Sequence, residues 1–80
     1  MDNAVAGGFR PDGIRGLFRG AGVTQAYVAD ILGISLPSLV HRLNGDSEFR
    51  ASELKLLSKE FGVSIDELLS LVEDEKAKRA

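Results

Sequence analysis

The chain has 80 residues, no cysteine and one histidine, and its ten Lys and Arg against twelve Asp and Glu give a formal net charge of −2 at pH 7. The length allows one small domain. The absence of cysteine excludes a disulfide scaffold and, with a single histidine, a structural zinc site. Because there is neither a stretch of about 20 apolar residues nor a secretory signal, we expect a soluble intracellular protein without metal or cofactor.

The first segments of the chain predict a tail and a weak helix. Residues 1–8, MDNAVAGG, are small and end in two glycines, which favours a flexible tail before a domain over residues 9–72. From Pro11 to Ala21 the apolar residues recur at the helical spacing i, i+3, i+4 and i+7, and Pro11 suits the first helical position. Three glycines each weaken this helix by up to ~1 kcal/mol relative to Ala, so it should depend on tertiary packing: Gly13, Gly16 and Gly20.

Two short helices follow in close succession. Thr24 is a good N-cap for a helix that reaches about residue 32, and Gly33 suits the left-handed conformation in which helices often end. Ser35 then caps a third helix through Leu43, with Pro37 tolerated in its first turn. The sequence therefore predicts a helix, a tight turn and a second helix between residues 24 and 45.

The C-terminal half has the pattern of two more helices. A fourth covers roughly residues 51–60 and ends at Gly62, and a fifth begins at Ser64, where SIDE is the capping-box pattern. The charged residues 73–80, EDEKAKRA, should fray. No segment alternates like a strand, so we predict an all-α protein built as a compact five-helix bundle.

The stretch TQAYVADILGISLPSLVHRLNG resembles the helix-turn-helix of the phage repressor and Cro family, also called the XRE family. The similarity continues through SELKLLSKEFGVSIDELL and covers about residues 11–70. The residues that carry it are Thr24-Gln25, Val28-Ala29, Leu32-Gly33-Ile34-Ser35, Ser38-Leu39 and Asn44-Gly45.

This resemblance implies a lambda-repressor-like five-helix fold with the helix-turn-helix in helices 2 and 3. It also implies a sequence-specific regulator of transcription, of phage or bacterial repressor or Cro type, in the host cytoplasm or nucleoid. Its partner would be double-stranded DNA, bound by a homodimer on an operator with two half-sites, and its recognition helix, about Ser35–Leu43, would enter the major groove. No enzymatic activity, small-molecule substrate or membrane association is expected.

The resemblance also assigns roles to individual residues. Gln25, Ser35 and Ser38 match positions that touch phosphates, and Arg50 follows a loop where relatives contact the DNA backbone. Leu36, Pro37 and His41 match the base-reading positions, with Val40 beside them, although relatives often carry polar residues there. His41 can donate to a guanine or a phosphate, and Arg42 can reach a phosphate or a base edge. The predicted DNA-binding set is Thr24, Gln25, Ser35, Leu36, Pro37, Ser38, Val40, His41, Arg42, Asn44 and Arg50.

The charge distribution and the apolar reading face leave an alternative open. Between Arg10 and Arg50 five basic residues stand against four acidic ones, and most of the acidic excess follows residue 50. This distribution allows a weakly positive face, with help from the Arg10 segment, but it is not that of a strongly basic DNA-binding protein. The alternative is a protein-interaction module that kept the fold without DNA binding.

Some residues have plainer interpretations. Arg15 and Arg19, four apart on the first helix, more often form a solvated face than a phosphate clamp. The apolar residues of the last two helices belong to the core first, and any apolar face left over is a candidate dimer seam. The residues proposed for that seam are Leu56, Leu71 and Val72.

Overall fold

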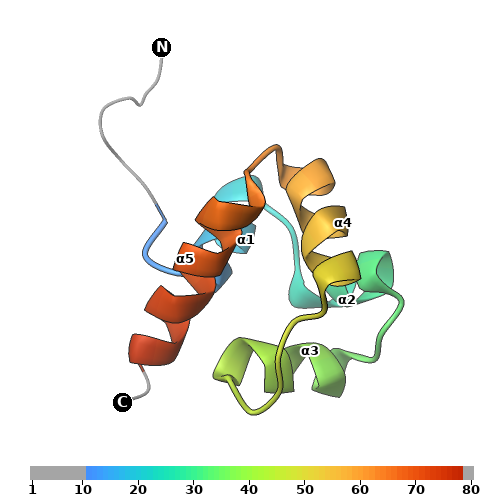
Figure 1. Cartoon of the computed structure of the whole chain (residues 1–80). Coiled ribbons are helices and arrows are strands. Elements are labelled where there is room, and N and C mark those ends of the chain that lie inside the picture. The colour runs from blue at the N-terminus through green and yellow to red at the C-terminus, as the bar shows by residue number, and fades with distance from the viewer. Residues whose placement is uncertain (1–10, 79–80) are drawn as a thin grey trace.

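The computed structural model describes residues 11–78, which form five helices and no strand. Figure 1 shows α3 lying across one end of the bundle, below α4 and beside the C-terminal end of α5. The all-α, five-helix prediction is confirmed; the predicted tail over residues 1–8 and the Arg10 segment lie outside the described residues. The bounds are α1 Ile14–Ala21, α2 Gln25–Leu32, α3 Leu36–Asn44, α4 Ala51–Phe61 and α5 Ile65–Ala77.

Three of the helices begin as their local sequence predicts. Thr24, Ser35 and Ser64 each have extended backbone, and each side-chain oxygen accepts the N–H of the residue three positions later, at 3.0, 3.2 and 3.0 Å. Each cap satisfies one of the N–H groups that a helix start leaves without an intrahelical partner. The predicted caps of α2, α3 and α5 are therefore confirmed.

The start of α1 differs from the prediction. The helix begins at Ile14, so Pro11 precedes it rather than occupying its first position. Its N-cap is Gly13, at φ 153°, which has no side chain to accept an N–H. The acceptor comes instead from Glu75 on α5, whose carboxylate accepts the N–H of Arg15 at 3.1 Å. A Cβ added at Gly13 would lie 2.5 Å from that carboxylate, so glycine is required for this approach.

The core is aliphatic and is shared by all five helices. α5 packs on α1, α3 and α4, while α2 packs on α3 and α4. One aromatic pair, Phe18 with Phe61, adds a ring contact at 5.5 Å between centroids. The buried apolar residues are Ile14, Phe18, Val28, Ala29, Leu32, Leu39, Leu43, Leu54, Leu57, Leu68, Leu71 and Val72.

The C-terminal helix departs from prediction in two ways. Leu71 and Val72 are buried in the core of this chain, so they are not free to form a dimer seam, whereas Leu56 is exposed as expected. The helix also continues to Ala77, through most of the charged segment that we expected to fray. Both differences arise because α5 lies against three other helices, which cover more than one of its faces.

Candidate nucleic-acid interface

The turn between α2 and α3 is short and closed by backbone hydrogen bonds. Gly33 adopts φ 69°, a left-handed conformation that glycine adopts without steric cost. The N–H groups of Gly33 and Ile34 return to the carbonyls of Asp30 and Ala29 at 3.1 and 3.0 Å. Ser35 then caps α3 directly. This geometry fixes α3 against α2 through a turn too tight for a longer loop.

The two sides of α3 differ in burial. Leu39 and Leu43 are buried at 0% and 1% exposure and fasten the inner side to the core. On the outer side Leu36 is 44% exposed, Pro37 is exposed and Val40 is half-buried. Leu36 and Val40 are four residues apart, so they lie on the same side of the helix. We call Leu36, Pro37 and Val40 the apolar reading face.

The serines at the start of α3 bond mainly to each other. Ser35 Oγ accepts the N–H of Ser38 and donates to Ser38 Oγ at 2.9 Å, and the carbonyl of Ser35 accepts the N–H of Leu39. Pro37 has no N–H to offer. The start of α3 therefore keeps few free donors for a phosphate, although the hydroxyl proton of Ser38 remains available.

His41 is an exposed polar residue that directly follows Val40 in α3. Its side chain is 63% exposed, and Nδ1 lies 3.3 Å from the carboxylate of Asp46. When Nδ1 carries the proton it donates to Asp46, which leaves Nε2 directed elsewhere as an acceptor in the neutral ring. Protonation of the ring would turn Nε2 into a donor. His41 can therefore form one hydrogen bond outward while Asp46 orients it.

Arg42 points into the protein rather than outward. Its side chain is 11% exposed; Nε donates to Glu53 at 2.8 Å, and Nη1 donates to the carbonyl of Ser38 at 3.3 Å. The same oxygen of Glu53 accepts the N–H of Arg50 at 2.9 Å and so caps α4. Arg42 thus links α3 to α4, and the structure does not place it among the outward residues expected to meet DNA.

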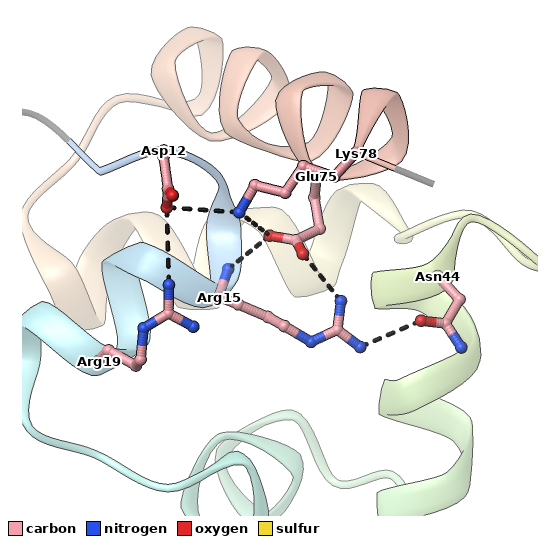
Figure 2. Close-up of polar contacts among 6 residues, drawn as sticks. All are labelled: Asp12, Arg15, Arg19, Asn44, Glu75 and Lys78. Carbon is pink, nitrogen blue, oxygen red and sulfur yellow. Dashed lines mark hydrogen bonds and ion pairs between the residues drawn. The ribbon is translucent and has the colours of Figure 1, made fainter. Parts of the chain in front are cut away.

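Asn44 ends α3 inside a polar cluster that joins three helices (Figure 2). Arg15 donates from Nη2 to Asn44 Oδ1 at 3.0 Å and from Nη1 to Glu75 at 2.9 Å. Glu75 is only 4% exposed. Because the guanidinium is a donor only, the carbonyl of the Asn44 amide must face it. The amide nitrogen is thereby turned away from Arg15, where it can donate to another group.

The outer part of the cluster is solvent-exposed. Lys78 lies 3.3 Å from Asp12 and 3.8 Å from Glu75, and Arg19 lies 3.6 Å from Asp12. The hydrogen bond and the charge of Lys78 lower the pKa of Asp12 below its ordinary value. Arg19, whose side chain is 66% exposed, is solvated as predicted, whereas Arg15 is 24% exposed and bonds the buried Glu75, so it does not belong to a solvated face.

Three predicted residues lie at helix starts near this motif. Thr24 is exposed, but its hydroxyl oxygen is used as the α2 cap. Gln25 is half-buried in the first turn of α2, and Arg50 is exposed at the start of α4. Within residues 11–78 the guanidinium of Arg50 forms no ion pair, unlike that of Arg15, Arg19 or Arg42.

A sequence model of the helix-turn-helix family matches residues 14–68, from the first residue of α1 to the first turn of α5. The match covers more than half of the chain. This chain belongs to the helix-turn-helix family. Its type is that of the XRE regulators, which agrees with the resemblance seen in the sequence. Comparison with curated proteins and with solved structures gave no match.

Membership of the helix-turn-helix family confirms the general class of function. The family is one of DNA-binding regulators and is not an enzymatic family. No helix among the described residues is both long and apolar enough to cross a membrane. In the same residues, no group of three His, Asp or Glu side chains is arranged to hold a metal ion.

Two functional features of this helix-turn-helix protein were not found from the sequence. Among residues 11–78, Glu53 and Glu75 are the acidic residues with the lowest exposure, at 4% each, and both hold arginines that come from other helices. Glu53 stands at the third position of α4, which is a local signal for a capping role. Glu75 lies in a charged run near the chain end, where local sequence offers no such signal.

Proposed function

We propose that this helix-turn-helix protein is a small transcriptional regulator of repressor or Cro type, which acts by occupying an operator with α3 in the major groove. The observation that carries the proposal is the asymmetry of α3. Leu39 and Leu43 fasten its inner side, while Leu36, Pro37 and His41 remain exposed outside. A helix held in this way by a preceding helix and a tight turn is suited to the width of the major groove.

The proposed phosphate contacts come from residues that retain a free donor. Gln25 stands in the first turn of α2, where helix N–H groups favour an anion. The hydroxyl of Ser38 and the outward amide nitrogen of Asn44 can each donate one hydrogen bond. Arg50 supplies a charge that no other described residue neutralises. Ser35 and Thr24 act as caps in this proposal, and Arg42 acts from inside by fixing α3.

We further propose that the protein binds as a homodimer to an operator with two half-sites. Two-fold symmetry would then separate the recognition helices by about 34 Å, one turn of DNA. Since Leu71 and Val72 are buried, the apolar side chains available for a seam on α4 and α5 are Leu56 and Leu69, at 42% and 46% exposure.

Selection of binding sites from a random duplex library, followed by a salt titration on the selected site, tests this function. We expect an inverted repeat with half-sites one turn apart. We also expect the logarithm of the binding constant to fall with the logarithm of salt concentration by about 0.9 for each phosphate contacted. A scrambled duplex of the same composition is the control. If no sequence is enriched even at low salt, the DNA proposal is wrong and the protein-interaction alternative takes its place, since an apolar contact hardly depends on salt.

A further inference from the structure

We infer that the apolar reading face selects bases by their C5-methyl group, and therefore accepts 5-methylcytosine in place of thymine at the base pairs it covers. The inference rests on the proposed function and specifies what α3 reads. It concerns Leu36, Pro37 and Val40, whose side chains contain carbon atoms only.

Few hydrogen-bonding side chains surround the apolar reading face. Ser35 is engaged by Ser38, and the guanidinium of Arg42 is turned inward to Glu53. Before Asn44 at the end of α3, the hydroxyl of Ser38 and the ring of His41 are the polar groups left on the outer side. The first turn of α3 therefore has no side chain able to make the bidentate contacts by which Arg, Asn or Gln read a base.

The major groove presents one kind of apolar group to carbon side chains. The thymine methyl is the apolar group among the base edges of unmodified DNA, and burial of one such carbon favours binding. Leu36 is exposed enough to cover a methyl group, and Val40 lies one helical turn further on the same side. The apolar reading face is therefore complementary to methyl groups at neighbouring base pairs.

Thymine and 5-methylcytosine present the same methyl group in the major groove. Both carry the methyl group at C5, and their partners, adenine and guanine, both present N7 as an acceptor. The two pairs differ in the central groups, where O4 and the adenine amino group are replaced by the cytosine amino group and O6. Leu, Pro and Val have no donor or acceptor with which to detect this exchange. Discrimination at these positions is thus between methyl and no methyl.

The test uses the full chain and the selected operator with single base pairs replaced. Replacing thymine by uracil removes only the methyl, and we expect Kd to rise about fourfold at each covered position, as for one buried carbon group. Replacing T·A by C·G should weaken binding by at least as much. Replacing T·A by 5-methylcytosine·G should leave Kd within about twofold of the original, because the methyl is retained.

A double-mutant cycle assigns the effect to the reading face. Leu36→Ala should reduce the thymine-to-uracil ratio at one position to about one, because the partner of the methyl is gone. Lys59→Ala is the control, since Lys59 is exposed in the last turn of α4 and belongs to neither the apolar reading face nor the proposed dimer seam, and it should leave the ratio at about four.

The outcomes separate this inference from the proposed function. A selected operator that binds uracil and thymine equally well, or that loses as much affinity with 5-methylcytosine as with cytosine, overturns methyl reading and leaves the regulator proposal standing. A selected site without thymine at the covered positions does the same. Failure to enrich any duplex overturns both.

Discussion

The two halves of α3 differ in the side chains that they expose and in the contacts that hold them. Its first half, Leu36 to Val40, turns carbon side chains outward and has few free hydrogen-bond donors. Its second half is tied down by charge: Arg42 bonds Glu53 on α4, and Asn44 bonds Arg15, which in turn bonds Glu75 on α5. The contrast shows that two arginines, Arg15 and Arg42, hold α3 against its neighbours. In the proposed function, the selection of bases falls to the half that carries no charge.

Two of the twelve acidic residues, Glu53 and Glu75, are paired with arginines inside the structure, although the formal net charge of the protein remains −2. Acidic residues here neutralise arginines inside the structure, so they contribute little repulsion where they are buried. Removing one partner from such a pair leaves an uncompensated buried charge, which costs about 3–5 kcal/mol. The buried acids are therefore expected to affect the free energy of unfolding, and the exposed residues to affect DNA affinity.

The largest expected effect is that of Glu75→Ala. This change removes the acceptor of the Arg15 N–H at the start of α1 and the partner of the Arg15 guanidinium. We expect the free energy of unfolding to fall by about 4 kcal/mol, measured by urea denaturation. Glu73→Ala is the matched control, because Glu73 is 74% exposed and its ion pair within residues 11–78 is with Lys76 at 3.6 Å. Equal losses for the two variants would show that Glu75 does not hold the bundle together.

A somewhat smaller loss is expected for Arg42→Met, which keeps the length of the side chain but leaves Glu53 without its cation. Unfolding free energy should fall by about 3 kcal/mol. The sequence selected from a duplex library should nevertheless be the same as for the unchanged protein, measured at a temperature where the variant is folded. A changed base preference would show that Arg42 contacts bases. It would contradict the assignment of base selection to the first half of α3.

The exposed Arg50 should behave in the opposite way. Arg50→Ala should weaken operator binding about fivefold for any bound sequence and reduce the salt slope by about one, because a phosphate contact is lost. Unfolding free energy should change little. Lys59→Ala, at the other end of α4, removes the same charge away from the proposed interface. If Lys59→Ala changes the salt slope as much as Arg50→Ala, the effect is one of net charge and Arg50 makes no specific contact.

The smallest expected effect on stability comes from an exposed hydrogen bond between α2 and α4. Tyr27 donates to Glu60 at 2.9 Å, and this hydrogen bond, with the charge of Glu60, raises the pKa of Tyr27 above 10.0. This hydrogen bond therefore stabilises the folded state below about pH 10. The stabilisation is lost as the pH rises through the raised pKa of Tyr27 in the folded state. Because the chain has one tyrosine and no tryptophan, tyrosinate absorbance reports this pKa directly. Glu60→Gln should lower it toward 10.0; an unchanged titration curve would show that the bond does not persist in solution.

Local signals explain which features the sequence predicts. Thr24, Ser35 and Ser64 cap their helices through residues three positions away, so a short window contains both partners. The left-handed conformation of Gly33 can also be predicted from a short window, since it depends only on the end of α2. The helix-turn-helix could therefore be predicted from residues 24–45 alone.

Contacts between distant residues explain what could not be predicted. The cap of α1 comes from Glu75, sixty residues from Arg15 along the chain, so the local sequence predicts a helix start at Pro11 although α1 begins at Ile14. Arg42 turns inward because its hydrogen-bond acceptor, Glu53, lies on α4. Periodicity identifies one apolar face of a helix, but α5 is covered by three neighbours, which is why buried residues were proposed for a dimer seam.

Intermolecular NMR contacts between the protein and the selected operator test the central claim most directly. The account predicts NOEs from thymine methyl protons to side-chain protons of Leu36, Pro37 and Val40, with the guanidinium of Arg42 remaining close to Glu53. A complex whose thymine methyl groups contact no residue of α3, or in which Arg42 leaves Glu53 to reach a base, would contradict it.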